Sequence, residues 1–446
     1  MQTTPYLMRN KELGKDMPVG VGLIGLGTVG SGVVELLQDA PVSLRRRKHV
    51  DFALRRVAVR DLDKPRSLAL APELLTADAS AVVADPDVQL VVELTGAPPA
   101  FEWVSAALRQ GKDVVTANKA LLAERGEELF ELALANGADL MFEASVAAGI
   151  PIIRSLRNGL VANRVESLYG ILNGTTNYML TRMSRGVGDY DDVLKEAQDQ
   201  GYAEPDPTMD VSGMDAAQKL AILCRIAFHC TGTGRDVFCE GIEQIESRDI
   251  EYARELGYAI KLLAIAKQQD GRVEARVHPA MVPEDALLAN IHDEFNAIQV
   301  QGSAVGPQVF SGRGAGQLPT ASAVVADMVE LVERKAAGAS TSIGDMILGE
   351  DAVSVVPIED VQMRYFIRVL VRDQPGVLAG IARILAEERI SIASVIQKER
   401  DFEGGSVPLV IVTHEAREAA MQRAQQAVAT LDAVQGSVKL IRMEDL

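Results

Sequence analysis

The chain has 446 residues, enough for about three domains, and its 24% charged and 48% apolar residues are ordinary for a globular protein. A formal net charge of −17 opposes binding to nucleic acid, which usually requires a basic face, and no uncharged run reaches the ~18 residues of a membrane helix. Residues 1–17 lack the apolar core of a secretion signal, and the three cysteines have neither an even number nor CxxC spacing. The composition therefore indicates a cytoplasmic protein with reduced thiols, whose partners are neither nucleic acid nor membrane.

The first motif is a glycine loop between a predicted strand at 19–24 and a predicted helix that includes 32–37. It has the G-x-G-x-x-G pattern in the strand–loop–helix setting that this pattern needs, and reads Gly25-Leu26-Gly27-Thr28-Val29-Gly30. Glycines permit the tight turn and let backbone amides approach a pyrophosphate, which the helix N-terminus also attracts. The motif predicts a dinucleotide-binding Rossmann domain.

The second predicted strand, 54–59, is followed by a cationic turn. Arg60 comes first, then Asp61, Lys64 and Arg66. An NAD-binding domain usually has an acid here for the ribose 2′-hydroxyl, whereas cations suit a 2′-phosphate. The turn therefore favours NADP(H), with Asp61 leaving NAD(H) open and a merely solvated turn as the alternative.

Two more predicted strands, 90–94 and 113–116, end in polar loops. The loops read Thr95-Gly96-Ala97-Pro98 and Ala117-Asn118-Lys119. Ligands bind outside the carboxyl ends of strands in open α/β sheets. Lys119 is therefore predicted to touch the nicotinamide or the substrate, against the alternative of a solvated loop lysine.

An apolar segment at 140–143 leads into a loop of small residues, 145–151. Such a loop exposes backbone carbonyls, and with a nearby carboxylate it could ligate a hard cation such as Na⁺. From the residues alone, a close-packed turn is the favoured interpretation.

Residues from about 152 to 320 do not continue the parallel α/β repeats. Strands are predicted at 166–172, 272–278 and 296–301, and a second glycine loop, 312–316, precedes a predicted helix at 321–332. Between the first two of these strands lies a loop that is stiffened by two prolines and carries Glu204, followed by a helix in which Asp215 and Lys219 are four residues apart. Asp215 and Lys219 share one helix face, so together with Glu204 they could bind a polar substrate and move its proton. The alternative is a surface salt bridge worth about 0.3–0.5 kcal/mol.

Six motifs in this order make the chain resemble homoserine dehydrogenase: GLGTVG at 25–30, TANK at 116–119, EASVAAGIP at 143–151, NGTTNY at 173–178, GYAEPDPTMDVSGMDAAQKL at 201–220 and GRGAGQLPTA at 312–321. They span roughly the first 335 residues. The resemblance implies reversible oxidation of L-homoserine to L-aspartate 4-semialdehyde with NAD(P)⁺, within threonine and methionine biosynthesis.

The resemblance also implies roles for the charged residues. Lys219 matches the residue usually given as the acid/base, and Lys119 is a second candidate for proton transfer at the substrate oxygen. Glu204 and Asp215 would bind the amino group and hydroxyl end of the substrate. A buried lysine with a lowered pKa can take the hydroxyl proton or polarise the aldehyde oxygen without a zinc ion. Which lysine performs the transfer stays open.

Two further sets of positions follow from the resemblance. Those matching nucleotide contacts, together with the glycines of the first loop, are Gly25, Gly27, Thr28, Val29, Gly30, Thr95, Lys119, Gly201 and Gly316. Those matching a monovalent-cation loop, mostly through carbonyls, are Glu143, Val146, Ala148 and Ile150. The chain departs from the pattern in lacking an acid directly after the second strand, which leaves the choice of cofactor open.

The tail is predicted to be a separate domain. After a segment of small residues it alternates as strand 365–371, helix 377–387, strands 391–397 and 408–413, helix 418–431 and strand 437–442, the βαββαβ order of a ferredoxin-like fold. Its first turn, 373–378, resembles the ligand loop of ACT domains, so Asp373, Gly376 and Val377 would meet an amino-acid effector, by analogy L-threonine. The alternative is a domain that only dimerises.

The predicted fold class is thus α/β, with an N-terminal Rossmann domain (1–150), an α+β catalytic and dimerisation domain (151–335), a linker (336–356) and a ferredoxin-like ACT domain (357–446). The segment near 305–335 is expected to pack back on the Rossmann domain. Paired ACT modules imply a homodimer or homotetramer. The alternatives are another Rossmann reductase of amino-acid metabolism and a nucleotide-sensing Rossmann–ACT regulator without catalysis.

Overall fold

The structure is a computed structural model that describes residues 18–39, 48–66, 68–269, 271–349, 352–397 and 405–446. Its internal contacts divide the chain into two compact units. The first contains residues up to 162 together with 221–234 and 310–352, and the second contains 163–220, 235–309 and 353–446. Both units therefore combine segments that are distant in sequence.

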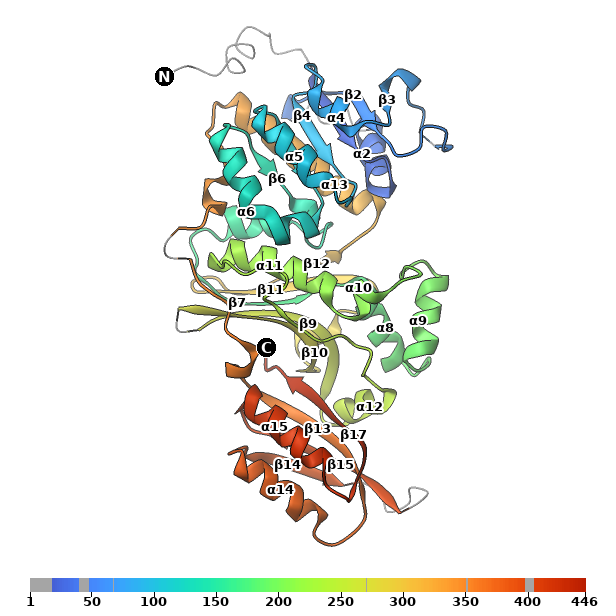
Figure 1. Cartoon of the computed structure of the whole chain (residues 1–446), viewed down its shortest axis with the longest axis vertical. Helices are drawn as coiled ribbons and strands as arrows, with labels where there is room; N and C mark the ends of the chain where they lie inside the picture. The colour runs from blue at the N-terminus through green and yellow to red at the C-terminus, as the bar shows by residue number, and fades with distance from the viewer. Residues whose placement is uncertain (1–17, 40–47, 67, 270, 350–351, 398–404) are drawn as a thin grey trace. The chain divides into compact units, whose positions relative to one another are not determined.

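The first unit is built on a six-stranded parallel sheet (Figure 1). In sequence order its strands are β1 (Val19–Ile24), β2 (Phe52–Ala58), β3 (Leu75–Thr76), β4 (Leu90–Glu93), β5 (Asp113–Thr116) and β6 (Leu140–Met141). In space they run β3-β2-β1-β4-β5-β6, the order of a dinucleotide-binding fold, which confirms the predicted Rossmann topology. The helices of this unit include α2 (Thr28–Asp39), α4 (Ala79–Ala84), α5 (Ala100–Arg109), α6 (Lys119–Ala135) and, much later in the chain, α13 (Gln317–Ala336).

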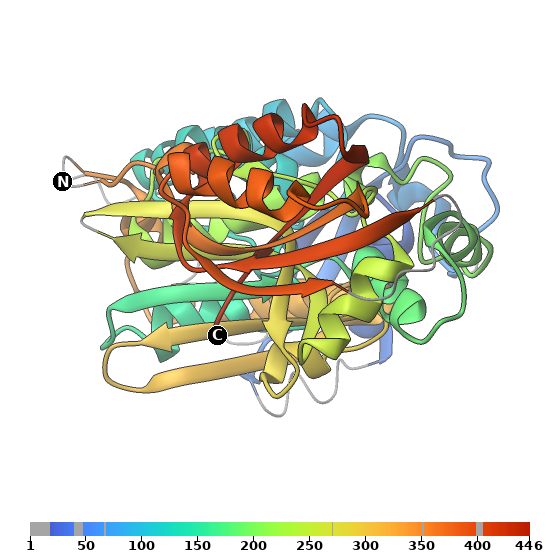
Figure 2. The same ribbon diagram turned by 90° about the horizontal axis from the view of Figure 1, so that it is seen from below.

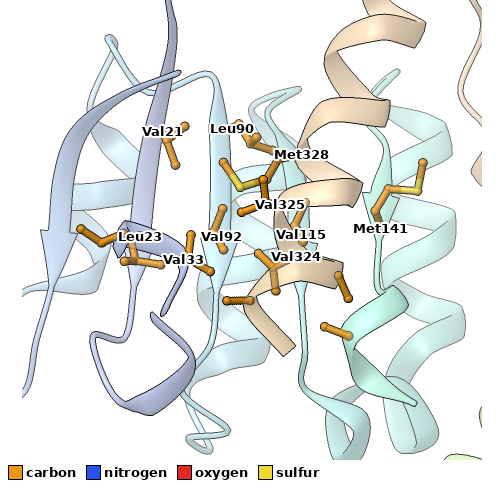
Figure 3. Close-up of a cluster of buried hydrophobic side chains, with 14 of the residues drawn as sticks. Val21, Leu23, Val33, Leu90, Val92, Val115, Met141, Val324, Val325 and Met328 are labelled. Carbon is orange, nitrogen blue, oxygen red and sulfur yellow. The ribbon is translucent and has the colours of Figure 1, made fainter. Parts of the chain in front are cut away.

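Helix α13 closes one face of this sheet. Val324, Val325 and Met328 from α13 pack on Val92 and Val115 from the central strands (Figure 3). The helix also packs on α2, where a Cβ added to Gly32 would come within 2.8 Å of the carbonyl oxygen of Gln317. Burial of these apolar side chains therefore brings residues 317–336 onto a sheet formed by the first third of the chain.

The second unit contains most of a mixed sheet, ordered β12-β11-β7-β9-β10-β17-β13-β15-β14. Its first part comprises β7 (Val165–Ile171), β9 (Tyr258–Gln269), β10 (Arg272–Pro283), β11 (Phe295–Gly302) and β12 (Gly306–Arg313). Strand β9 could not be predicted from the sequence, because a continuous apolar run does not distinguish a buried strand from a buried helix. The associated helices are α8 (Gly174–Ser184), α9 (Tyr190–Asp199), α10 (Thr208–Val211), α11 (Met214–Phe228) and α12 (Ser247–Glu255).

The tail has the predicted βαββαβ order. Its elements are β13 (Gln362–Arg372), α14 (Val377–Glu387), β14 (Ile392–Gln397), β15 (Ser406–Thr413), α15 (Glu418–Ala429) and β17 (Val434–Met443). Helices α14 and α15 contact each other and lie on one face of these strands (Figures 1 and 2).

The tail is less separate than the sequence suggested. Strand β17 pairs with β13 on one side and, in parallel, with β10 on the other, where Ala280 lies opposite Arg442 and Met281 opposite Met443. The tail strands thus extend the sheet of the preceding segment. Backbone pairing of this kind leaves no composition signal, so the sequence could not reveal it.

The predicted linker is anchored by polar contacts. In the first unit, the backbone N–H of Ser342 donates to Asp139 (2.6 Å), and Arg157 forms an ion pair with Asp345 (2.7 Å). In the second, Val355 bridges to Val273 on β10. These bonds satisfy backbone and charged groups that a solvated linker would leave to water.

Candidate functional site

The glycine loop has the geometry that a dinucleotide needs. Gly25 has φ = 102°, a region that favours glycine, and a Cβ on Gly30 would lie 2.1 Å from the carbonyl oxygen of Gly25. The first and third glycines are therefore required by the turn and by close packing of helix on strand. A Cβ on Gly27 would meet no atom within 4 Å, so this glycine has no packing role and leaves open space beside the N-terminus of α2. Thr28 and Val29 begin that helix. The loop fits a pyrophosphate held on backbone amides.

The loops after β4 and β5 lie at the same edge of the sheet as the glycine loop. Thr95 is exposed at the end of β4, and Lys119, half-buried, is the first residue of α6. Asn118 caps this helix by accepting a hydrogen bond from the backbone N–H of Leu121 (3.1 Å). Gly316, with φ = 120°, caps α13, the helix that packs on α2. The first unit therefore brings most of the predicted nucleotide contacts to one edge.

The cationic turn after β2 is only partly available to a ligand. Both terminal nitrogens of Arg66 bind backbone carbonyls of its own loop, with Nη1 3.1 Å from Leu62 O and 3.0 Å from Lys64 O, and Nη2 on Asp61 O. Asp61 accepts from the backbone N–H of Asp63 (2.9 Å). Arg66 thus shapes the loop, while Arg60 is exposed directly beyond the end of the strand. Arg60 and Lys64 are the exposed cations of this turn.

The predicted cation loop is buried in the first unit. Glu143, Val146, Ala148 and Ile150 each have at most 5% of their surface exposed. Both carboxylate oxygens of Glu143 accept backbone N–H bonds, from Ile153 and Arg154 (2.8 Å each), at the start of α7 (Ile152–Arg154). Burial raises the pKa of the Glu143 carboxyl above its ordinary value, and these two bonds oppose the shift.

The carbonyls of this loop retain capacity for an ion. Within the described residues, no backbone N–H donates to the carbonyl of Val146 or Ala148, whereas Ile150 O accepts from Ile152 N at 2.7 Å. Gly149 packs tightly, since a Cβ there would lie 2.4 Å from Arg313 O. The loop is thus a close-packed turn, and its oxygen donors also suit a hard monovalent cation.

The Asp215–Lys219 pair lies in the second unit on one face of α11. Lys219 Nζ is 2.7 Å from Asp215 Oδ2 and 2.7 Å from the carbonyl oxygen of Leu172 at the end of β7. The two side chains are only 10% and 13% exposed, so the pair is not a solvated surface bridge. An ammonium group has three donors, and these two bonds fix its direction.

Two residues next to this pair were not predicted as site residues. The amide of Asn173 donates to Asp215 (3.0 Å) and to Asp210 (2.8 Å), and its oxygen caps α8 through the N–H of Thr176 (2.8 Å). Burial, with a contribution from the charge of Asp215, raises the pKa of Asp210 above its ordinary value, although Asn173 opposes the shift. The available signals were Asn173 in the NGTTNY motif and Asp210 five residues before Asp215. Neither indicates contact across 42 residues.

Glu204 lies in the exposed loop between α9 and α10. The carbonyls of Glu204 and Pro205 each accept a hydrogen bond from the Gln198 side chain (3.3 Å). The preceding Tyr202 packs against Tyr178, with ring centroids 4.7 Å apart and ring planes tilted by 34°. These contacts hold the backbone of the loop, and Glu204 itself is exposed in it. Gly201, with φ = 77°, opens this loop in the same unit.

The ACT-like loop of the tail is open to solvent. Gly376 has φ = 95° and caps α14, and Asp373, through its N–H, donates to Gly405 O (3.0 Å). Asp373 and Gly376 are exposed and Val377 is half-buried.

In the described ranges there is no group of three His, Cys, Asp or Glu side chains that could hold a metal, and none of the helices has the length and apolarity to cross a membrane.

Three family models match the chain in succession. Residues 25–143 match "Homoserine dehydrogenase, NAD binding domain", residues 151–329 match "Homoserine dehydrogenase", and residues 365–430 match "ACT domain". The tail is therefore an ACT domain, as its loop indicated.

Named relatives agree over nearly the whole chain. Homoserine dehydrogenase of Pseudomonas aeruginosa is 42% identical, covering 96% of this chain and 99% of the relative, and that of Bacillus subtilis is 40% identical over 96% and 98%. The crystal structure of a homoserine dehydrogenase from Thiobacillus denitrificans superposes with a TM-score of 0.88 at 45% identity, covering 96% and 99% of the two chains. A hyperthermophilic archaeal homoserine dehydrogenase mutant in complex with NADPH covers 71% of this chain and 98% of its own at 25% identity, with a TM-score of 0.60.

Proposed function

Because this chain belongs to the homoserine dehydrogenase family, we propose that Lys219, with Asp215, Glu204 and Lys119, carries its reaction. A homoserine dehydrogenase is an oxidoreductase of amino-acid biosynthesis that interconverts L-homoserine and L-aspartate 4-semialdehyde with a nicotinamide cofactor. The observation that supports Lys219 is its short contact with both Asp215 and Leu172 O, 2.7 Å each, on a largely buried helix face.

The proposed roles follow from what each group can donate or accept. A nicotinamide cofactor held by the glycine loop would supply the acceptor for the hydride from C4 of homoserine. In its neutral form the Lys219 amine receives the hydroxyl proton at the same stage, and in the reverse direction its ammonium form returns the proton to the aldehyde oxygen. Asp215 holds Lys219 in place and accepts from the substrate, and Glu204 binds the substrate ammonium group. Lys119 is the second candidate for contact at the substrate oxygen.

The preferred cofactor is proposed to be NADP(H), with Arg60 binding the 2′-phosphate. Arg66 is engaged by its own loop, so Arg60 is the cation expected to discriminate. Replacing Arg60 with serine is expected to lower kcat/KM for NADP⁺ about 10-fold or more, since a charge-assisted contact is worth roughly 1.5–3 kcal/mol, and to leave kcat/KM for NAD⁺ nearly unchanged. Initial rates with both cofactors measure this. Arg66→Ser is the comparison, and equal losses with both cofactors in Arg60→Ser would contradict the assignment.

A sodium ion is proposed at Glu143 and the carbonyls of Val146, Ala148 and Ile150. The support is the set of buried oxygen donors, two of which accept no backbone hydrogen bond among the described residues. Replacing NaCl with choline chloride at constant ionic strength is expected to lower the melting temperature, because bound ion stabilises by about 2.7 kcal/mol at 100 times its Kd. Glu143→Gln should lose most of this difference, and Asp327→Asn, which changes the buried carboxylate 2.8 Å from Glu143 N, should keep it. Identical melting of the wild type in both salts would reject the ion.

The ACT domain is proposed to bind L-threonine at Asp373, Gly376 and Val377 and to inhibit the enzyme. The continuity of β17 with β10 supports control of the catalytic domain by the tail. L-Threonine is expected to inhibit the wild type, and Asp373→Ala is expected to raise the half-inhibitory concentration about 10-fold, the loss of one charge-assisted hydrogen bond. Asp432→Ala changes an exposed acid elsewhere in the same domain and should behave as wild type. Unchanged rates and no calorimetric binding with L-threonine would reject this effector.

We further propose a division of the chain by function. Residues 1–150, with the return of 305–335, would form the cofactor domain, residues 151–335 the substrate and dimerisation domain, residues 336–356 the linker and residues 357–446 the regulatory domain. A homodimer or homotetramer is expected from pairing of ACT domains, and light scattering decides between them. A cytoplasmic location is expected because the number and spacing of the cysteines indicate reduced thiols, and because the family has a biosynthetic role.

A further inference from the structure

A buried carboxylate lies at the edge of the sheet where the cofactor loops meet. Glu93, the last residue of β4, has 0% of its surface exposed. Its Oε1 accepts from the backbone N–H and the hydroxyl of Thr95 (2.7 Å each), and its Oε2 accepts from the hydroxyl of Thr116 (2.8 Å). This carboxylate thus accepts hydrogen bonds from one backbone amide and two hydroxyls.

The two threonines belong to different loops. Thr95 lies in the loop after β4, two residues beyond the end of the strand, and Thr116 ends β5. The hydroxyl oxygen of Thr116 in turn accepts from the N–H of Asn118 (3.1 Å), whose side chain caps the helix that starts with Lys119. A continuous series of hydrogen bonds therefore runs from the Thr95 loop through Glu93 to the start of α6.

Packing alone does not account for an acid at this position. The neighbouring residues of β4, Val91 and Val92, are fully buried and apolar, and an apolar residue at position 93 would avoid the cost of removing a charge from water. A carboxylate instead accepts three short hydrogen bonds in a fixed geometry. The carboxylate of Glu93 therefore fixes the position of the loop after β4 relative to the loop after β5.

We propose that Glu93 is a positioning residue for hydride transfer, which holds Thr95 and Lys119 in register at the nicotinamide end of the cofactor. This inference rests on the proposed cofactor contacts of those two residues. Glu93 itself touches neither cofactor nor substrate, and acts through the two loops.

Glu93→Gln in the full-length enzyme tests the proposal, because it keeps the shape but turns one acceptor into a donor. We expect kcat/KM for NADP⁺ to fall about 10- to 100-fold, the usual effect of losing a group that orients a functional residue. The Kd for NADPH, measured by fluorescence, should rise, while the KM for L-homoserine should change little. The wild type is measured first, since failure of wild type to bind NADPH would contradict the proposed cofactor, not the role of Glu93.

Asp113→Asn is the matched control. Asp113 is a buried carboxylate at the opposite end of the neighbouring strand β5, where it accepts from the N–H of Asp139 (2.9 Å) and pairs with Lys335 (3.1 Å). The Asp113→Asn variant should have a lower melting temperature than the wild type, with kcat/KM for NADP⁺ and the Kd for NADPH unchanged. If Glu93→Gln also lowers only the melting temperature, the proposal is wrong.

A second pair of variants covers the case in which Glu93→Gln does not fold. Thr116→Val removes the hydroxyl that links Glu93 to α6 and should reproduce the cofactor defect, whereas Thr116→Ser retains the hydroxyl and should restore wild-type constants. Wild-type constants in Thr116→Val would overturn the proposal.

Discussion

Replacement of Lys219 by alanine is expected to lower kcat for L-homoserine oxidation by about 10²- to 10⁴-fold, the usual range for loss of a general acid or base. The side chain contacts Asp215 Oδ2 and Leu172 O at 2.7 Å, so its ammonium group has a fixed direction. Truncation removes the group that handles the proton and leaves the helix intact. Steady-state rates with NADP⁺ and L-homoserine measure the loss, and circular dichroism checks the fold.

Two comparison variants make this result specific. Lys195→Ala removes an exposed lysine on α9 of the same unit and should turn over at the wild-type rate. Lys119→Ala distinguishes the two candidate lysines, since the one that transfers the proton should show the larger fall in kcat. Near-normal turnover by Lys219→Ala would remove it from the mechanism, and no turnover by the wild type would contradict the reaction itself.

Replacement of Arg442 by methionine is expected to reduce the free energy of unfolding by about 3–5 kcal/mol, the usual cost of removing one partner from a buried ion pair. Arg442 binds Glu418 through two nitrogens (2.6 and 3.0 Å) and Glu240 through a third (2.7 Å). Glu418 has 0% of its surface exposed, so the variant leaves a buried charge without its cation. Urea unfolding at neutral pH measures the loss.

Adding Glu418→Gln to Arg442→Met should recover most of this stability, because the uncompensated charge is then removed while Tyr365 keeps an acceptor for its hydroxyl. Arg383→Met provides the surface comparison, since Arg383 and Glu387 are 70% and 62% exposed and should contribute less than about 1 kcal/mol. Equal losses in Arg383→Met and Arg442→Met would show that burial does not govern the pair.

The pH dependence of this loss has a definite sign. Burial pushes the pKa of Glu418 upward, but the bonds from Arg442 outweigh it and the pKa lies below its ordinary value. Folded protein therefore binds this proton less readily than unfolded protein, and the stabilisation is present above the unfolded pKa of about 4.3. It is lost as the pH falls through the lower folded pKa. The difference between the wild type and Arg442→Met should thus shrink below about pH 4.

The Rossmann sheet of the first unit shows which features could be predicted from local sequence. Strands β1 and β5 were predicted with the boundaries that the structure has, because a short apolar run expresses a local preference. Helix α2 begins at Thr28, inside the glycine motif, whereas the sequence indicated a helix from 32. Glu93, in the same region, was not predicted to have a role. An acid ending an apolar strand is a weak signal, and its partners lie in two separate loops.

In the candidate site, too, one contact could be predicted from local sequence and the others could not. An i,i+4 spacing predicts that Asp215 and Lys219 share a helix face, and the structure confirms that they are in contact. Their burial and their bonds to Leu172 and Asn173 join residues more than 40 positions apart, since the sequence separations are 47 and 42. The assigned roles of Glu204, Lys119 and the cation loop stay predictions.

The strand–helix alternation of the Rossmann domain, the βαββαβ order of the tail, the cofactor motif and the family could all be predicted from the sequence, because they depend on patterns within a few residues or on motifs in a fixed order. The three-dimensional structure was needed to show that α13 closes the first sheet, that β17 joins the ACT strands to β10, and that Arg442 and Glu418 pair in the interior. Each of these depends on backbone pairing or burial between distant segments, for which no single stretch of the chain carries a signal.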